Sequence, residues 1–307
     1  MTSKDWAAYS CELPPRPFGK TSALTSLYHV THSHTAVRII DDGRISRGLV
    51  YDESRLNVTR RTVVWVSPNI WHYGSRYGTV QFEFDWAKLV AGKTLYWVEA
   101  MTEYSPPAVR FFLTREDVSD LPGIVPYDPV RHNGPLHYDG EKWWWNGSYT
   151  AEIMVDDHLS LGDCTKIDFV AHHNQYCNIG HHQCTERGKD GNDSAMRVMA
   201  HILASQRETV NHALKRDDGS LSGPAERALV LIGMSLRSRK GPDGPVRKSS
   251  EVTAVMKAAM SQIAIGRMND AKKLASLLKS ESLIWACLQE LCKDHFDVES
   301  SSIAEAL

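Results

Sequence analysis

Glu152 is a carboxylate at the start of a predicted buried strand, directly after a segment rich in aromatic residues. The strand covers Ala151–Val155, and the preceding segment contains Trp143, Trp144 and Trp145. Successive side chains of a strand point to opposite faces, so three consecutive tryptophans cannot all enter one core from a strand. At least one is expected to face solvent, a loop or a ligand. Glu152 is then either a functional group beside that aromatic loop or a strand-end carboxylate that points to water.

A second group of chemically active residues follows the β-rich part of the chain. His172, Cys177, His181 and Cys184 have the spacing His-x4-Cys-x3-His-x2-Cys. Two imidazoles and two thiolates suit zinc, and four protein ligands leave no open position for catalysis. We therefore expect a structural zinc site. The alternative is a polar loop whose histidines bind no metal.

A third group combines aromatic faces with hydrogen-bonding side chains. His29 and Thr31 lie on a short apolar strand, Trp65 and Ser67 lie at the end of another, and a loop at 71–78 follows. This mixture suits a flat heteroaromatic ligand. The alternative is an aromatic corner of the core with a half-buried strand histidine. The polar and aromatic members of the loop include Tyr73, Arg76 and Tyr77.

The elements that would position these groups are mainly strands. Seven short runs rich in β-branched and aromatic residues predict strands at 27–30, 62–66, 79–84, 95–100, 109–113, 151–155 and 166–171. One helix is predicted at 34–42 with Gly43 as its C-cap. Helical spacing dominates from residue 193 onward. We therefore expect an α+β protein with an N-terminal arm at 1–24, a β-rich domain at 25–172, a His/Cys-rich loop at 173–192 and a helical domain at 193–307.

Composition narrows the function classes. The 307 residues include 35 Lys+Arg and 37 Asp+Glu, a net charge of −2, so a polyanion would have to bind a local patch. No apolar run reaches the length of a membrane span, and the N-terminus lacks the apolar core of a secretory signal. Six cysteines in a chain of this length fit reduced thiols or a metal site better than a disulfide framework. We expect a cytoplasmic protein with no membrane partner.

In combination, these motifs resemble the ADP-ribosyltransferase superfamily in their order of His, aromatic residue and Glu. The segments that show this resemblance are His29-x-Thr31, Trp65–Tyr77 and Thr150-Ala151-Glu152. Within that superfamily the chain looks most like the DarT-type toxins, which ADP-ribosylate DNA bases. The segment Leu27–His32 resembles their opening, and Ala151–Val155 followed by Thr165–Val170 resembles their catalytic strand and its neighbour. The resemblance covers residues 25–172 and implies an ADP-ribosyltransferase-like split β-sheet domain that uses NAD.

The resemblance implies a role for each group. Glu152 would stabilise the oxocarbenium-like ribose that forms when the N-glycosidic bond of NAD breaks. His29 would hold the adenosine ribose, and the backbone of Val30 would hold the nicotinamide amide. Thr31 would support that turn. The remaining candidates for contacts with NAD are Trp65, Ser67, Tyr73 and Tyr77.

Two positions depart from the family pattern. Asn69 follows Pro68 where DarT-type enzymes carry an arginine implicated in activating the base, and Arg76 of the same loop is the candidate to replace it. Thr150 stands two residues before Glu152, where transferases for arginine or asparagine side chains usually carry Glu or Gln. This argues against an arginine-modifying toxin and leaves the acceptor open.

The segment before the catalytic strand faces the acceptor in this family. Exposed aromatic side chains stack on unpaired bases and contribute about 1–3 kcal/mol per base. We therefore expect a nucleic-acid acceptor, with a single-stranded or unpaired base favoured, while a protein that docks on aromatic residues is also compatible. The predicted acceptor-binding residues are Trp143, Trp144, Trp145, Tyr149 and Thr150.

Other classes of function stay open. One is a protein-directed transferase of the same fold, and another is a zinc-stabilised binding module whose aromatic cleft performs no chemistry. A third is a metal-dependent hydrolase built on the His/Cys segment. The helical domain at 193–307 carries no chemical motif, and its apolar positions fit a core or a surface for an antitoxin or another protein partner.

Overall fold

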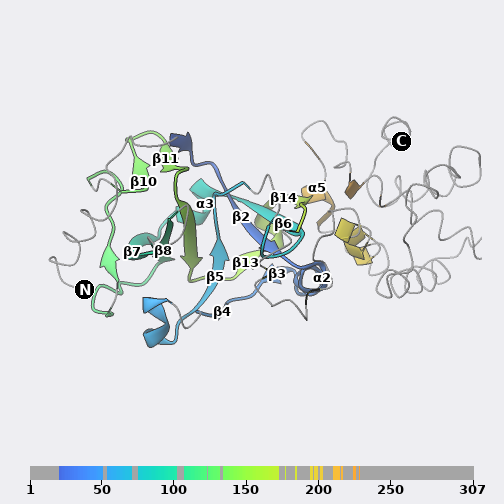
Figure 1. Ribbon diagram of the computed structural model, residues 1–307, viewed down its shortest axis with the longest axis horizontal. Coiled ribbons are helices and arrows are strands. Elements are labelled where there is room, and N and C mark those ends of the chain that lie inside the picture. The colour runs from blue at the N-terminus through green and yellow to red at the C-terminus, as the bar shows by residue number, and fades with distance from the viewer. Residues whose placement is uncertain are drawn as a thin grey trace, which may run out of the picture. The chain divides into compact units, whose positions relative to one another are not determined.

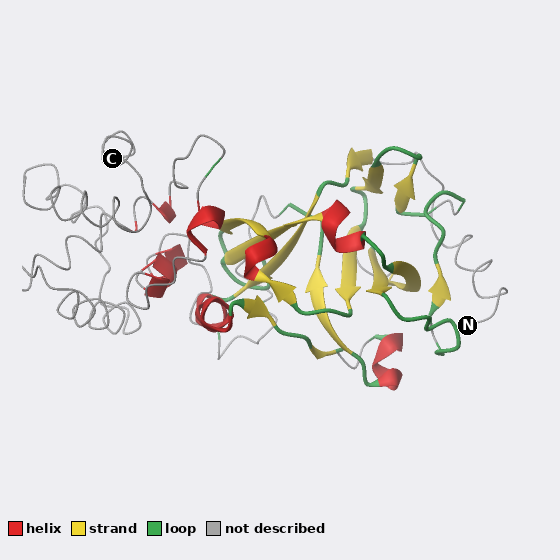
Figure 2. Ribbon diagram, turned by 180° about the vertical axis from the view of Figure 1, so that it is seen from behind, coloured by secondary structure: helices red, strands yellow, loops and turns green. Residues whose placement is uncertain are grey.

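The computed structural model describes residues 21–50, 54–70, 75–101, 107–122, 124–131 and 134–172, together with Cys177, Cys184 and parts of 194–228. Strands are the main regular secondary structure of this described part, and its helices are short (Figures 1 and 2). The α+β class predicted from the sequence is therefore confirmed, with sheet predominating. Residues 1–20 of the predicted arm at 1–24 and most of the predicted helical domain at 193–307 lie outside the described residues. Among the described residues, no helix has the length and apolar character needed to cross a membrane.

The chain forms two compact units that alternate along the sequence. The first comprises Met1–His29, Arg44–Ile70 and Glu83–Cys164, and the second comprises Val30–Gly43, Trp71–Phe82 and Thr165–Leu307. Each unit therefore gathers segments that are far apart in the sequence.

The largest sheet lies in the first unit and has six strands in the order β4-β5-β12-β8-β7-β9 (Figure 1). β12 pairs antiparallel with β5 and parallel with β8, and every residue of β8 is buried. A central strand that is covered on both faces reads as a continuous apolar run, which is why Val109–Leu113 was recognisable in the sequence. The strand bounds are β4 (Gly48–Leu49), β5 (Thr62–Val66), β7 (Thr94–Met101), β8 (Ala108–Thr114), β9 (Val125–Pro126) and β12 (Thr150–Val155).

One face of this sheet carries the core of the first unit. Phe112 and Met154 lie opposite each other on β8 and β12, and Leu56 of the 3-10 helix η1 (Arg55–Thr59) packs in the same buried cluster. Trp65 is partly buried against that cluster. Because side chains alternate, Glu152 and Arg110 lie on the same face as Met154 and Phe112. The Arg110–Glu152 pair therefore lies next to the apolar core on the same face of the sheet.

The tryptophan run forms a strand, so the loop predicted at this position is wrong. β11 (Trp143–Asn146) is the middle strand of a three-stranded sheet in the order β1-β11-β10, with β1 (Thr21–Ala23) and β10 (Leu136–Tyr138) at its sides. Aromatic side chains fit a half-buried pleated surface, and pairing on both edges satisfies the backbone of β11. β1 also shows that the last residues of the predicted N-terminal arm are a strand.

The remaining strands form two further sheets. β2 (Ser26–Thr31), β6 (Val80–Asp85) and β14 (Cys164–Phe169) form a sheet in the order β14-β6-β2, and β3 (Arg44–Ile45) pairs with β13 (Leu159–Ser160). The helices are α2 (Ser33–Asp42), α3 (Trp86–Val90), η2 (Leu161–Asp163) and α5 (Asn211–Leu214).

The seven predicted strands correspond to β2, β5, β6, β7, β8, β12 and β14, with ends that differ by two residues or fewer. The predicted helix corresponds to α2, and Gly43 is its left-handed C-cap at φ 67°. A glycine fits this position because it has no Cβ to clash at positive φ. The short strands β1, β3, β4, β9, β10, β11 and β13 were not predicted.

Gly78 of the second unit permits a close approach of two backbone segments. Its φ is +139°, and a Cβ at this position would lie 2.1 Å from the backbone carbon of Thr31. The neighbouring Thr79 N–H donates to the Thr31 carbonyl oxygen at 3.1 Å. The segment that begins at Thr31 is therefore held against 78–79 by direct backbone contact.

We expect Gly78→Ala to lower the free energy of unfolding by more than about 3 kcal/mol, because overpacking alone costs about 1–3 kcal/mol and positive φ adds strain. Gly48→Ala is the matched control, since no atom lies within 4 Å of a Cβ added there. Chemical denaturation of the two variants measures the difference. Equal stability of the two variants would contradict this account of Gly78.

Candidate functional site

His29 and Trp65 meet where strand β2 runs beside the end of β5. Tyr28 and Ser67 form an antiparallel bridge there, with N···O distances of 2.8 and 3.0 Å. Nδ1 of His29 lies 2.8 Å from the carbonyl oxygen of Trp65. A carbonyl oxygen only accepts, so Nδ1 carries the proton and donates it, and Nε2 of the neutral ring is an acceptor. Burial lowers the pKa of His29, and its backbone hydrogen bond to Trp65 opposes this only in part.

Arg110 connects Trp65 to Glu152. The Arg110 Cζ lies 5.3 Å from the centroid of the Trp65 ring, within the range of a cation–π contact. Nε of Arg110 donates to Oε2 of Glu152 at 2.7 Å, and Nη1 donates to Oε1 of Glu99 at 3.0 Å. His29, Trp65, Arg110 and Glu152 therefore form a continuous chain of contacts across β2, β5, β8 and β12 in the first unit.

Strand register explains this row of charges. Arg110 lies opposite Glu152 on β12 and opposite Glu99 on β7, where a register shift between Trp97 and Glu99 brings the carboxylate into line. The Arg110 and Glu99 side chains are 8% and 7% exposed, and that of Glu152 is 16% exposed. Two carboxylates and one guanidinium leave a negative balance in a site with little water. Burial acts to lower the pKa of Arg110, but the charges and hydrogen bonds of Glu152 and Glu99 outweigh it and raise this pKa.

The entrance of β12 is fixed by residues at the end of β5. The amide of Asn69 acts like a strand partner: its Oδ1 accepts from the Ala151 N–H at 3.0 Å, and its Nδ2 donates to the Tyr149 carbonyl oxygen at 3.3 Å. The Oγ of Ser67 lies 2.6 Å from the Ala151 carbonyl oxygen. Asn69, which departs from the family pattern, therefore holds the backbone at Tyr149 and Ala151, just before Glu152. Ser67, predicted to contact NAD, is buried and also contacts the backbone next to Glu152.

The predicted acceptor residues have different environments. Trp143 and Trp145 share one face of β11, and Trp143 packs edge to face on Trp86 with ring centroids 5.1 Å apart. Trp144 lies on the opposite face and its Nε1 donates to Oδ2 of Asp139 at 2.7 Å. Backbone N–H groups of residues 142 and 141, together with this indole, lower the pKa of Asp139 to about 2. The indole of Trp144 is therefore held by a carboxylate that stays ionised.

Tyr149 corrects a prediction, because its side chain is buried at 2% exposure and offers no exposed ring to a base. The backbone turns after Asn146, whose carbonyl oxygen accepts from the Tyr149 N–H at 3.2 Å, and this turn directs the ring inward. Burial raises the pKa of the Tyr149 hydroxyl. Thr150 is the first residue of β12 and is partly buried.

The other predicted NAD contacts belong to the second unit. Val30 and Thr31 are the last residues of β2. The guanidinium carbon of Arg76 lies 5.4 Å from the ring centroid of Tyr77. Tyr73 lies outside the described residues. The catalytic role of Arg76 stays a prediction.

A group of four residues in the second unit could hold a metal ion. It comprises His32, His172, Cys177 and Cys184, whose ligand atoms all lie within 4.8 Å of one another. Three of them were predicted as ligands from the sequence, and the fourth predicted ligand, His181, lies outside the described residues. His32 is the fourth member of the group among the described residues. It directly follows β2 at the N-terminus of α2 and is 3% exposed.

Three N···S separations in this group are close to the edges of a tetrahedral site. Bonds of about 2.3 Å to sulfur and about 2.0 Å to nitrogen give tetrahedron edges of about 3.3–3.8 Å. Nε2 of His172 lies 3.1 Å from the Cys184 Sγ, and Nε2 of His32 lies 3.3 Å from the Cys177 Sγ and 3.4 Å from that of Cys184. Nδ1 of His172 lies 2.6 Å from the Ser75 carbonyl oxygen, so it donates a proton and Nε2 presents its lone pair to the group. Metal-binding histidines typically have such a backbone partner.

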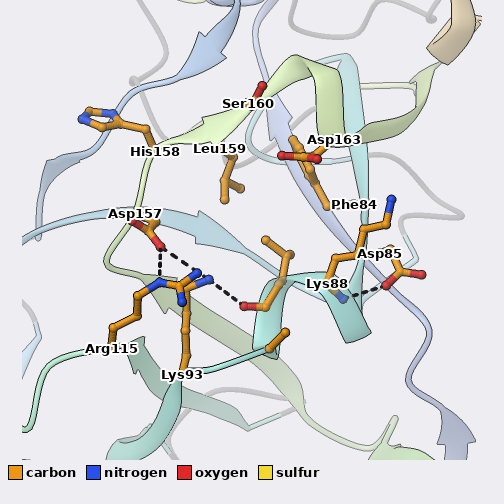
Figure 3. Close-up of a pocket in the computed structure, with 12 residues that line it drawn as sticks. Phe84, Asp85, Lys88, Lys93, Arg115, Asp157, His158, Leu159, Ser160 and Asp163 are labelled. Atoms are coloured by element: carbon orange, nitrogen blue, oxygen red, sulfur yellow. Dashed lines mark hydrogen bonds and ion pairs between the residues drawn. The ribbon is translucent and has the colours of Figure 1, made fainter.

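A cavity of about 540 Å³ also lies in the first unit, between α3 and the turn before β13 (Figure 3). Its cations are largely neutralised: Lys93 and Arg115 both approach Asp157, at 3.4 and 3.7 Å. None of the residues predicted to act on NAD, acceptor or metal lines it. We therefore place the candidate chemistry at the His29–Glu152 contacts and at the metal group.

Three functional candidates were missed in the sequence. Arg110 was visible as one charge inside the apolar run Val109–Leu113, and Glu99 as another inside 95–100. A charge in a buried strand requires a partner, so each was a signal of an ion pair. His32 lies 140 positions before His172 in the sequence, so no local spacing connects it to the metal group.

Comparison of the chain with protein-family models, with curated proteins and with solved structures gives no match. The site is therefore interpreted from its own geometry and from the resemblance of its motifs.

The lowered pKa of His29 predicts a loss of stability in acid. Below the ordinary pKa of 6.5 the unfolded chain binds a proton that the folded ring binds only at lower pH, so the free energy of unfolding falls as pH decreases through that window. Above 6.5 the His29 ring is neutral in both the folded and the unfolded chain, so its contribution to the free energy of unfolding is constant. We expect His29→Gln to flatten this dependence, as measured by urea unfolding at about pH 5.5 and about pH 7.5. The same substitution at exposed His34 is the control, and an unchanged slope in His29→Gln would contradict the prediction.

Proposed function

We propose that this chain is an NAD-dependent mono-ADP-ribosyltransferase that transfers ADP-ribose to a nucleic-acid base. The observation that carries the proposal is the continuous set of contacts from His29 through Trp65 and Arg110 to Glu152. His29, Trp65 and Glu152 are the residue types in the motif resemblance. Arg110, which the resemblance does not include, joins Trp65 to Glu152. Packing of a core alone does not require a neutral histidine, a tryptophan face and a fixed carboxylate at one place, because buried polar groups cost free energy. A ligand site does require such groups.

The reaction follows from the chemistry of the glycosidic bond. The bond between the ribose C1 and the nicotinamide nitrogen breaks, and nicotinamide leaves with the electron pair. The ribose then carries positive charge, and a nucleophilic atom of the acceptor base bonds to C1 and releases a proton. A carboxylate that is oriented before the charge develops stabilises this transition state without reorganisation. Glu152 has this property in the proposal, because Arg110 and strand β12 already hold it.

Electrostatics support the same assignment. Glu99, Arg110 and Glu152 together carry one net negative charge in a poorly hydrated row. A substrate that becomes positive in the transition state complements this balance better than a neutral or anionic one. His29 is neutral, and Nε2 of its ring is an acceptor suited to a ribose hydroxyl.

Trp144 supports a nucleic-acid acceptor. Its indole is partly exposed and is fixed by the bond to Asp139, so stacking on a base would cost little side-chain entropy. Trp143 packs on Trp86 instead, and Tyr149 is buried. In the proposal, Trp144 is therefore the main stacking residue for an unpaired base. A protein acceptor is the alternative outcome of the acceptor test.

We propose zinc as the metal of the second unit. Two thiolates and two imidazoles favour zinc, and four protein ligands assign it a structural role. It would connect the start of α2 to the chain after β14 through His32 and His172. Thiolate ligands such as Cys177 and Cys184 in the proposed zinc site require a reducing compartment, so we place the activity in the cytoplasm.

Glu152→Gln tests the assignment of the carboxylate. The amide keeps the shape and an acceptor for Arg110 but loses the charge, so we expect transfer of label from NAD to fall by about 100-fold or more. Glu116→Gln is the matched control, because it also neutralises a glutamate paired with an arginine, but at an exposed position. Thermal unfolding verifies that both variants fold. Retained labelling in folded Glu152→Gln would overturn the role of Glu152.

The acceptor is identified by incubating the protein with labelled NAD and cell lysate and then digesting with nuclease or protease. Label that is released by nuclease and lost in Trp144→Ala supports the proposed acceptor. Label that is released only by protease identifies a protein-directed transferase. Zinc without any turnover of NAD identifies a binding module.

The choice of fourth ligand is tested by metal analysis of purified variants. We expect about one zinc per chain in the wild type and loss of zinc in His32→Gln and Cys177→Ser. His34→Gln is the matched control: the His34 ring centroid lies 5.6 Å from that of His32, but His34 is not part of the ligand group. Zinc lost in His181→Gln and retained in His32→Gln would favour the ligand set predicted from the sequence.

A further inference from the structure

The Arg110 guanidinium is held in one orientation by three contacts. Its Nε and Nη1 donate to different carboxylates, at 2.7 Å to Glu152 and at 3.0 Å to Glu99, and the Trp65 ring lies 5.3 Å from its Cζ. The guanidinium is planar, so hydrogen bonds from two of its nitrogens fix both its position and its plane. An ammonium group at the same place would be a point charge without this directionality.

Glu99 is the rigid end of the row. Its Oε1 accepts from Arg110, and its Oε2 accepts from the backbone N–H of Arg55 at 3.0 Å, at the start of η1. It is also buried, whereas Glu152 is the most exposed of the three side chains. The order of anchoring therefore runs from backbone to Glu99, to Arg110 and then to Glu152.

We infer that Arg110 is a positioning residue that aims the Glu152 carboxylate at the ribose of NAD, and that Glu99 fixes Arg110 for this task. The inference rests on the proposed function and adds residues that the motif resemblance does not include. Arg110 acts through Glu152 and not on the substrate, so its loss should slow the chemical step and leave NAD binding largely unchanged. A misplacement of about 1 Å in such a group costs about 100-fold in rate.

The chain offers a matched control in Arg61. This arginine also bridges two carboxylates of the first unit, with Nη1 2.6 Å from Glu116 and 3.1 Å from Asp156. The hydrogen bond to Glu116 is the largest effect on the pKa of Arg61, and together with the charges of Glu116 and Asp156 it raises this pKa. Among the described residues, the carboxylates that pair with Arg61 are those of Glu116 and Asp156 and not that of Glu152, so Arg61 reproduces the ion-pair chemistry away from the proposed reaction.

The experiment compares Arg110→Lys with Arg61→Lys in the full chain by steady-state cleavage of NAD. We expect kcat to fall about 100-fold in Arg110→Lys with KM changed by less than about threefold, because the loss is confined to the transition state. Arg61→Lys should keep both constants. The double variant Arg110→Met, Glu99→Met replaces the buried ion pair by apolar side chains, which commonly preserves folding, and should show the same fall in kcat.

The outcomes separate the inference from the proposed function. NAD cleavage that is lost in Glu152→Gln but unchanged in both Arg110 variants overturns the inference and leaves the proposed function standing. An equal fall in kcat in Arg61→Lys assigns the effect to general stability and also overturns the inference. Absence of NAD cleavage by the wild type, or its persistence in Glu152→Gln, overturns the proposed function and the inference together.

Discussion

The buried guanidinium of Arg110 is the constraint on which the centre of the first unit depends. A charge at this depth costs several kcal/mol unless it is paired, and removal of one partner of a buried pair costs about 3–5 kcal/mol. Glu99 on β7 and Glu152 on β12 provide the partners, one from each neighbouring strand. A slip of either strand by one residue would move its glutamate to the opposite face of the sheet. The ion pairs therefore fix the register of the same strands that carry the proposed reaction.

Two histidines, one in each unit, are oriented by a hydrogen bond from Nδ1 to a backbone carbonyl oxygen. Nδ1 of His29 donates to the Trp65 carbonyl oxygen, and Nδ1 of His172 donates to that of Ser75. A backbone carbonyl is a rigid acceptor, so it selects the tautomer and orients the ring without a second ionisable side chain. In both cases Nε2 becomes the chemically useful atom. Nε2 of His172 lies 3.1 Å from the Cys184 Sγ, and Nε2 of His29 is the atom proposed to accept from a ribose hydroxyl.

The sequence predicted elements whose signal is local and missed those whose cause is a distant partner. Val80–Asp85 alternates buried and partly buried residues, and Val109–Leu113 is apolar except for Arg110, so both strands were recognisable from a few residues. Thr21–Ala23 has no such pattern and is a strand because β11 pairs with it. Three consecutive bulky residues cannot share one core, which predicts a loop for the tryptophans, whereas the middle strand β11 accommodates them on two faces. Glu152, His29, Cys177 and Cys184 were selected by residue type, whereas the positions of His32 and Arg110 beside them required the tertiary fold.

The pairing of β12 has a consequence for how the chain acquires its site. Ile153 of β12 pairs with Val66 on one side and with Phe111 on the other. Glu152 therefore joins the sheet only after the long chain segments between these residues have closed into loops. Non-local contacts of this kind form late, because the entropy of loop closure must be overcome before the contacts stabilise the sheet. Partly folded chains, including those still emerging from the ribosome, therefore lack the aligned carboxylate. The topology itself delays the proposed activity until synthesis of the β-rich part is complete.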